Sequence, residues 1–253
     1  MGFLLAIIVV LIFAAIWYLP LVKKQQRLSG MVTKKDLRKA FLLGLIPATI
    51  VILIAEIALG WILKFAGLSD GTLLYNILMS FFVYGAIEEI VKYECARICL
   101  KSKAGLKRID IMVLFAAVGI GYEVTESIFF GNVIASVLRG VFVAHMMYQL
   151  VMAHFYCESL KAKAAGNKKK AGNRMALAFL IPILVHGLND FGCHMMSYQG
   201  SSMDSDMQTL ICLAGVFVLQ LVLAIVGIRL ANKEPEYDFE AERENRRRRR
   251  KGY

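Results

Sequence analysis

Long apolar segments recur along this chain and leave it few ways to fold. Seven of them are long enough to cross a bilayer as helices, which takes about 20 residues each. Hydrophobic residues make up 58% of the chain, more than an ordinary soluble domain contains. We predict an all-α fold, a polytopic membrane helix bundle of about seven transmembrane helices, since the sequence lacks the alternating strands of a membrane barrel. The predicted spans are Gly2–Val22, Ala40–Phe65, Tyr75–Leu100, Ile109–Phe130, Val133–Tyr156, Met175–Met196 and Thr209–Leu230.

The positive charge of the chain, a net +11, is gathered in alternate loops. Most of the Lys and Arg residues lie in Lys23–Lys39, Lys101–Arg108, Lys161–Arg174 and Arg229–Lys251, and the loops between these stretches have none. By the positive-inside rule the basic stretches face the cytoplasm. We therefore predict a multi-pass protein of the cell membrane with its N-terminus outside and its C-terminus inside. The same distribution argues against nucleic acid as a partner.

Two regions follow from this topology. Residues 1–230 form one integral membrane domain, and residues 231–253 form a charged tail ending in a run of arginines. We expect the tail to be disordered and attracted to anionic lipid at the cytoplasmic face. The first apolar segment lacks a basic n-region, so we expect an uncleaved anchor rather than a signal peptide. The loop 162–173, rich in Lys, Gly and Ala, predicts a flexible cytoplasmic link.

The strongest functional signal is the sequence Glu88-Glu89-Ile90-Val91-Lys92, which lies inside the third apolar segment. Each charge near a bilayer centre costs roughly 2.5–3.5 kcal/mol on insertion scales, so three together indicate a functional site. Glu88 and Lys92 are four residues apart, and so they share a helix face and can pair. A purely structural salt bridge is the alternative, but two acids exceed what one lysine needs.

Three further segments carry ionisable residues at helical spacing. His186 and Asp190 are four residues apart, so the carboxylate can orient the imidazole or join it as a ligand. Arg139 is a candidate partner for one of the surplus carboxylates. Glu123 could belong to the same polar site, or it could lie at the outer interface and reach water. The residues concerned are Glu123 and Glu126 in the fourth segment, Arg139 and His145 in the fifth, and His186 and Asp190 in the sixth.

The predicted topology places these residues at a common depth. Glu88, His145 and His186 all fall near the bilayer midplane, because successive spans run in opposite directions. Slightly outward of them lie Glu126, Arg139 and Asp190. We predict that polar residues from four helices meet in a hydrated cavity inside the bundle, open toward the outer leaflet.

Such a cavity can activate water with or without a metal. Glu88 could act as a general base, while His145 and His186, with Glu126 as a further ligand, could bind zinc. Alternatively, the two histidines could stabilise an oxyanion in a metal-free hydrolysis. The sequence lacks the H-E-x-x-H, G-x-S-x-G and G-x-G-D motifs of other membrane proteases.

In this order and spacing the residues resemble the PrsW family, which belongs with the CAAX prenyl endopeptidases and bacteriocin-processing membrane proteins. The resemblance spans about Tyr75 to Phe191. One departure is Tyr122, which stands four residues before Glu126 where the family usually has Phe. The elements that carry it are E-E-x-x-K from Glu88 to Lys92, aromatic-x-x-x-Glu126, Arg139 with His145, and His186-x-x-x-Asp190.

The resemblance implies an intramembrane protease. PrsW-type proteins make the first, site-1 cut in a membrane-anchored anti-sigma factor, on its extracytoplasmic side, so a single-span protein of this kind is the implied substrate. By the same analogy Glu88 and Glu89 activate water, and His145 and His186 bind metal or stabilise the oxyanion. Lys92, Glu126, Arg139 and Asp190 then support them.

A proton- or ion-coupled small membrane transporter is the alternative function, because it could use the same buried carboxylates as a relay. The small size of the chain and the lack of an inverted repeat or of paired broken helices argue against it. A catalytically idle membrane scaffold is a third reading, against which stand candidate residues on four separate helices.

Overall fold

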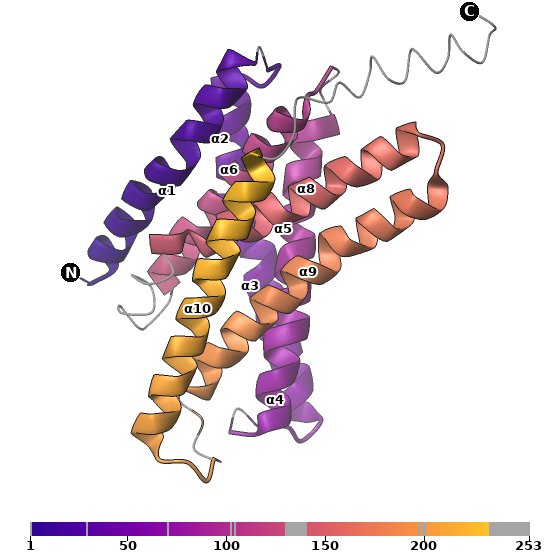
Figure 1. Cartoon of the computed structure of the whole chain (residues 1–253). Helices are drawn as coiled ribbons and strands as arrows, with labels where there is room; N and C mark the ends of the chain where they lie inside the picture. The colour runs from indigo at the N-terminus through magenta and orange to yellow at the C-terminus, as the bar shows by residue number, and fades with distance from the viewer. Residues whose placement is uncertain are drawn as a thin grey trace, which may run out of the picture.

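The computed structural model describes residues 2–28, 30–69, 71–101, 103, 105–129, 141–196, 198 and 201–232. Within these residues the regular elements are helices (Figure 1). They are α1 (Gly2–Arg27), α2 (Lys34–Leu43), α3 (Thr49–Phe65), α4 (Leu73–Leu78), α5 (Glu88–Lys101), α6 (Arg108–Phe129), α8 (Ala144–Ala164), α9 (Lys168–Met195) and α10 (Ser205–Asn232). Two π-helical segments, η1 (Gly44–Ala48) and η2 (Met79–Ile87), join α2 to α3 and α4 to α5.

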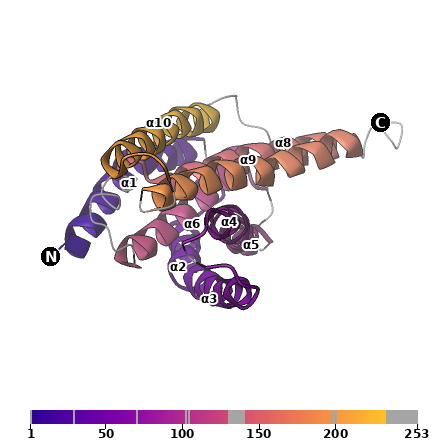
Figure 2. The same cartoon turned by 90° about the horizontal axis from the view of Figure 1, so that it is seen from below.

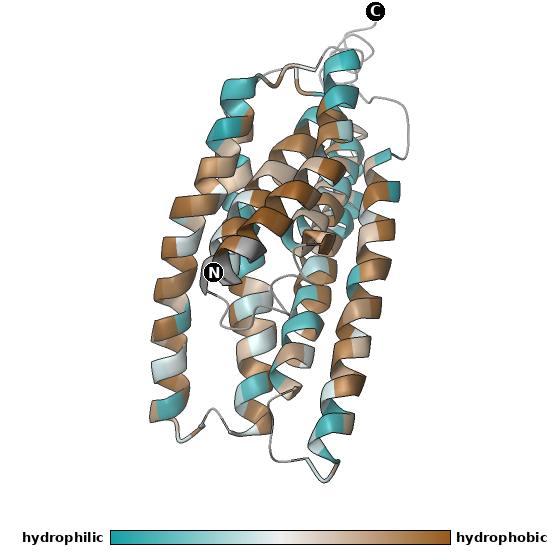
Figure 3. Cartoon of the chain, turned by 90° about the vertical axis from the view of Figure 1, so that its left-hand side faces the viewer, coloured by the Kyte–Doolittle hydropathy of each residue, from teal (hydrophilic) through white to brown (hydrophobic). Residues whose placement is uncertain are grey.

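Five helical stretches are long and apolar enough to cross a membrane. Much of the length of the outer helices is hydrophobic, and hydrophilic residues gather toward their ends (Figure 3). This confirms the predicted all-α membrane bundle. Within the part of the chain that the structure describes, the five are Ile7–Arg27, Lys34–Phe65, Leu73–Lys101, Lys168–Met195 and Ser205–Asn232.

The helices α6 and α8 correspond to the fourth and fifth predicted spans and form the centre of the bundle. Side chains from Met112 to Val118 in α6 and from Ala144 to Ala153 in α8 are all buried. Seen from below, α6 lies between α1 and α10 on one side and α2 and α3 on the other (Figure 2). These two helices can therefore carry polar residues that the surrounding helices shield from lipid.

Glycines set the closest helix contacts near the polar residues. A Cβ on Gly119 of α6 would lie 2.5 Å from the carbonyl oxygen of His145 in α8. A Cβ on Gly85 of η2 would lie 2.8 Å from the carbonyl oxygen of Ile183 in α9. Small residues let helix backbones approach in this way inside membranes. As a result α6 and α8, and likewise η2 and α9, are close enough for their polar side chains to touch.

Local irregularities adjoin the polar residues. The segment η2 ends at Ile87, directly before Glu88, and π-helical turns are rare and often occur at functional sites. Pro47 lies inside the π-helical segment η1.

The prediction of a flexible link at 162–173 is wrong. The helix α8 continues to Ala164 and α9 starts at Lys168, with Gly166 in the left-handed conformation (φ 72°) between them. The side chain of Asn167 caps α9 by accepting a hydrogen bond of 2.9 Å from the Lys170 amide. Capping thus begins the helix where composition alone predicted a loop, and α8 and α9 form an antiparallel pair (Figure 1).

Candidate active site

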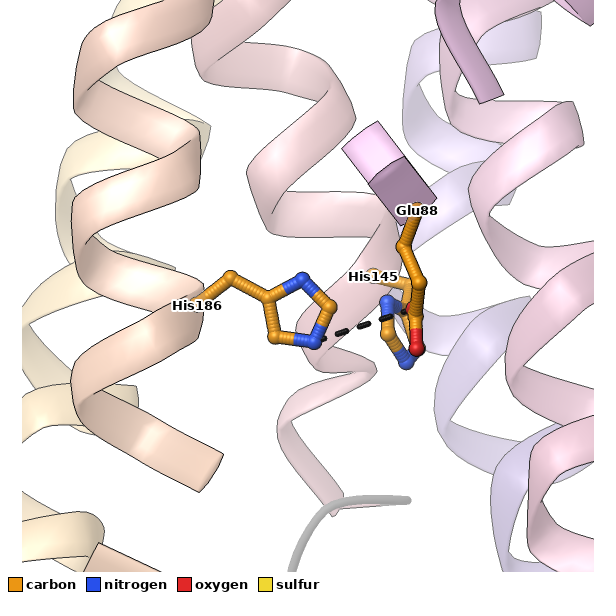
Figure 4. A group of neighbouring side chains, drawn as sticks. All are labelled: Glu88, His145 and His186. Atoms are coloured by element: carbon orange, nitrogen blue, oxygen red, sulfur yellow. Dashed lines mark ion pairs between the residues drawn. The ribbon is translucent and has the colours of Figure 1, made fainter. Parts of the chain in front are cut away.

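Polar side chains from four helices converge in the middle of the bundle. Glu88, His145 and His186 point toward one another (Figure 4), with ligand atoms that all lie within 4.8 Å of each other. The predicted residue Arg139 lies outside the described residues. We call the set that meets here the acid–imidazole centre: Glu88, Glu89 and Lys92 from α5, Glu126 from α6, His145 from α8, and His186 and Asp190 from α9.

Lys92 is the cation at the heart of the acid–imidazole centre, and its side chain is fully buried. Its ammonium nitrogen lies 2.6 Å from Glu89 Oε1 and 3.3 Å from Glu88 Oε2. It also lies 2.8 Å from His145 Nδ1 and 4.7 Å above the centre of the Tyr122 ring. One lysine thus neutralises part of a larger carboxylate charge, so a structural Lys–Glu pair does not account for the acids present.

The two adjacent glutamates have different surroundings. Glu89 has three close contacts, with Lys92 at 2.6 Å, with Gln149 Nε2 at 2.8 Å and with His186 Nδ1 at 3.0 Å. Glu88 lies 3.3 Å from Lys92, and its Oε2 is 3.8 Å from His186 Nε2. Glu89 is therefore held in place, whereas Glu88 is the more loosely held carboxylate.

His186 presents one ring nitrogen that lacks a hydrogen bond. A carboxylate only accepts hydrogen bonds, so Nδ1 donates to Glu89. Nε2 is buried, lies 3.1 Å from Asp190 Oδ2 and 3.8 Å from Glu88 Oε2, and makes no hydrogen bond within the described residues. A lone pair facing carboxylate oxygens is satisfied by a proton or a metal ion. The carboxylate on the opposite nitrogen is the support that metal-bound histidines commonly have.

His145 bridges the lysine and a third carboxylate. Its Nδ1 accepts from Lys92 at 2.8 Å, since an ammonium group only donates, and its Nε2 pairs with Glu126. The backbone amide of His145 donates to the Glu123 carboxylate at 2.9 Å. Glu123 is 1% exposed, so it anchors the start of α8 and does not reach water at the outer interface. Both imidazole nitrogens of His145 are therefore engaged, whereas on His186 only Nδ1 makes a hydrogen bond to a described residue.

Sequence reasoning missed two residues of this region. Tyr148 of α8 stacks on His186, with ring centres 4.7 Å apart, and no charge signals its place. Glu56 of α3 lines a cavity of about 240 Å³ beside the acid–imidazole centre, which we call the α3 cavity. Glu56 could have been noticed as the acid inside the apolar segment Ala40–Phe65. The other polar residues around the α3 cavity are Thr49, Tyr84, Tyr122, Glu126, Asp190, Cys193 and His194.

The fold and the acid–imidazole centre together define a helical membrane protein with a buried site of carboxylates and imidazoles. Residues 34–226 match the sequence model described as "PrsW family intramembrane metalloprotease", and the chain belongs to this family. It is 29% identical over 166 residues to "Protease PrsW" of Clostridioides difficile (strain 630), a match that covers 60% of this chain and 65% of that protein, slightly under two thirds of its length. No solved structure matches the chain.

Proposed function

We propose that this protein is an intramembrane peptidase that hydrolyses a peptide bond of a membrane-anchored protein. The observation that carries the proposal is the asymmetry between Glu88 and Glu89. Glu89 is held by three close contacts, while Glu88 is the more loosely held, buried carboxylate, with its Oε2 3.8 Å from Nε2 of His186. A carboxylate in that state can accept a proton from water as a general base. Membership of the PrsW family supports the same reaction class.

The contacts assign different roles to the neighbouring side chains. Glu88 takes a proton from water and returns it to the amine that leaves. Glu89 keeps His186 in one orientation and is a positioning residue. Lys92 contacts both carboxylates and His145, and it provides the positive field in which an oxyanion is stabilised.

A divalent metal, for which zinc is our candidate, fits part of this arrangement. Glu88, His145 and His186 lie close enough together to hold it, and in that case Glu88 would be a ligand rather than the general base. Bound there, such an ion supplies acidity to water and polarises a carbonyl group. Nδ1 of His145 is the atom that Lys92 contacts, so the lysine and a metal ion compete for it. Metal analysis of the purified protein, with cleavage measured after chelation, tests this assignment.

For the substrate we propose a single-span membrane protein of the anti-sigma factor type, cut first on its extracytoplasmic side. The predicted orientation supports this, because Glu126 and Asp190 lie in the second halves of α6 and α9, which run toward the outer face. The same orientation puts the basic tail in the cytoplasm beside anionic lipid.

Cleavage of a purified single-span protein tests the proposal. The protein in detergent should give one discrete cut near the outer end of the substrate span, located by the masses of the two products. The variant Glu88→Gln should not give it, while Glu94→Gln, at a half-exposed site paired with Arg97, should. The contacts from Lys92 through His145 to Glu126 could also relay protons. Glu88-dependent proton or ion flux into liposomes, without cleavage, would establish the transporter instead.

A further inference from the structure

The α3 cavity has features that the reaction itself does not use. It lies between α3, η2, α6 and α9 beside the acid–imidazole centre, and α3 is at the edge of the bundle (Figure 2). Its volume, about 240 Å³, exceeds the roughly 150 Å³ of an apolar cavity known to bind benzene, so it can take one long side chain. Ile52 and Leu53 supply an apolar wall, and three carboxylates supply a negative region: Glu56, Glu126 and Asp190.

Among the described residues, Glu56 is the carboxylate of this group that has no ion-pair or hydrogen-bond partner. Glu126 pairs with His145, and Asp190 lies 3.1 Å from His186 and accepts from Asn189 at 3.0 Å. Glu56 makes no ion pair or hydrogen bond within the described residues, although it is partly buried. A carboxylate withdrawn from water in this way is stabilised by an incoming cation.

A second, independent observation points to a cationic ligand. Nε2 of His186 is fully buried and lies 3.1 Å from Asp190 Oδ2, on the cavity wall, and 3.8 Å from Glu88 Oε2, without making a well-oriented hydrogen bond to any described residue. The lone pair and the surrounding carboxylates are all acceptors, and the nearby lysine, Lys92, is already shared between Glu88, Glu89 and His145. Among the described residues that line the α3 cavity, three are carboxylates and none is a lysine or arginine.

We propose that the α3 cavity is a specificity subsite that takes a Lys or Arg side chain of the substrate next to the scissile bond. Glu56 is its specificity-determining residue. The aliphatic stem of the basic side chain packs on Ile52 and Leu53, and its charged head meets Glu56. A site built to pair a buried charge rejects an isosteric neutral side chain, because its own polar group is then left unpaired. This inference rests on the proposed peptidase function.

A substrate panel tests it in the wild-type protein. Single-span substrates carry Lys, Met or Glu at each position flanking the mapped cut, and kcat/KM is measured for each one. At one position Lys should be preferred over Met by about 10- to 100-fold, and Glu should be cut most slowly. A Lys-to-Met ratio within about threefold at every position overturns the subsite. If no member of the panel is cut, the peptidase itself is refuted, so the two failures can be told apart.

The variant Glu56→Gln links the preference to this residue. It has nearly the shape of the native side chain, and it should lower the Lys-to-Met ratio to about threefold or less. Glu94→Gln should keep the wild-type ratio. A Lys preference that survives in folded Glu56→Gln overturns the role of Glu56.

Discussion

Two buried carboxylate clusters in this protein differ in how completely they are satisfied. Asp110, at the start of α6, is fully buried and accepts four hydrogen bonds of 2.9–3.1 Å. We call this the Asp110 cluster; its donors are the Gln25 side chain and the backbone amides of Met31, Val32 and Lys107. The acid–imidazole centre, by contrast, contains more carboxylates than lysines or arginines among the described residues, and Nε2 of His186 makes no hydrogen bond to them.

The comparison indicates that the Asp110 cluster stabilises the fold, whereas the acid–imidazole centre has groups that can take part in a reaction. In the Asp110 cluster both carboxylate oxygens have partners, and the contacts join the chain between α1 and α2 to the start of α6. A fully satisfied buried network makes a structure rigid. An incompletely satisfied one weakens the fold and persists where a ligand or a reaction uses it. Substitutions in the Asp110 cluster should therefore lower stability more than activity, and substitutions in the acid–imidazole centre should lower activity more than stability.

The largest expected effect is on activity, from Glu88→Gln. The amide keeps the size of the side chain but cannot take a proton from water, so the cleavage rate should fall by about 10³-fold or more. Stability should be unchanged or higher, because a surplus buried negative charge is removed while Lys92 keeps Glu89 at 2.6 Å. Cleavage rate and thermal unfolding in one detergent are the measurements. A variant that is unstable as well as inactive would contradict the comparison.

The Asp110 cluster predicts the reverse. Asp110→Ala leaves buried amide donors without an acceptor, which should cost at least about 3 kcal/mol of stability. Activity per folded molecule should stay within about threefold of wild type, since these contacts lie at the first turn of α6, far along the helix from Glu126. Asp110→Asn retains one acceptor and should lose less stability. Unfolding temperatures and the rate at saturating substrate test both variants.

A change at Gly119 should affect both properties moderately. The added methyl of Gly119→Ala would lie 2.5 Å from the carbonyl oxygen of His145, so α6 and α8 must separate and His145 must shift. We expect a loss of about 1–3 kcal/mol in stability and of about 10- to 100-fold in activity. The matched control is Gly215→Ala in α10, where a Cβ meets nothing within 4 Å. That change should stabilise the helix by about 0.5–1 kcal/mol and leave cleavage unaltered.

The smallest effect is expected at an exposed pair. Glu94 and Arg97 lie 2.7 Å apart, but both side chains are more than 40% exposed. Glu94→Gln should change stability by less than about 1 kcal/mol and the cleavage rate by less than about twofold. A larger loss of activity would show that acids outside the acid–imidazole centre also matter, which would remove the contrast between the two clusters.

Local spacing allowed part of the site to be predicted. The pairs Glu88 with Lys92 and His186 with Asp190 follow from four-residue separation along one helix, and both contacts are present. Contacts between helices were less accessible to sequence reasoning. The pairing of Glu89 with Gln149 depends on how α5 packs against α8, which in turn depends on glycine contacts and on η2.

The role of the peripheral helix was also hidden in the sequence. Glu56 meets its neighbours in the α3 cavity only after the chain has folded, because Glu126 and Asp190 lie far along the sequence. The apolar periodicity of α3 shows that the helix is in the membrane but not which of its faces adjoins the site. Hydropathy thus predicted the all-α architecture. Which residues line the α3 cavity became known only from the packed structure.

The most direct test of the account is a double-mutant cycle on cleavage between Glu88 and His186. If the two residues act in one catalytic unit, Glu88→Gln and His186→Gln should each reduce the rate by about 10³-fold. The double variant should then lose no more than about tenfold beyond the worse single variant. Independent multiplication of the two losses, or full activity in either folded single variant, would contradict a single acid–imidazole centre.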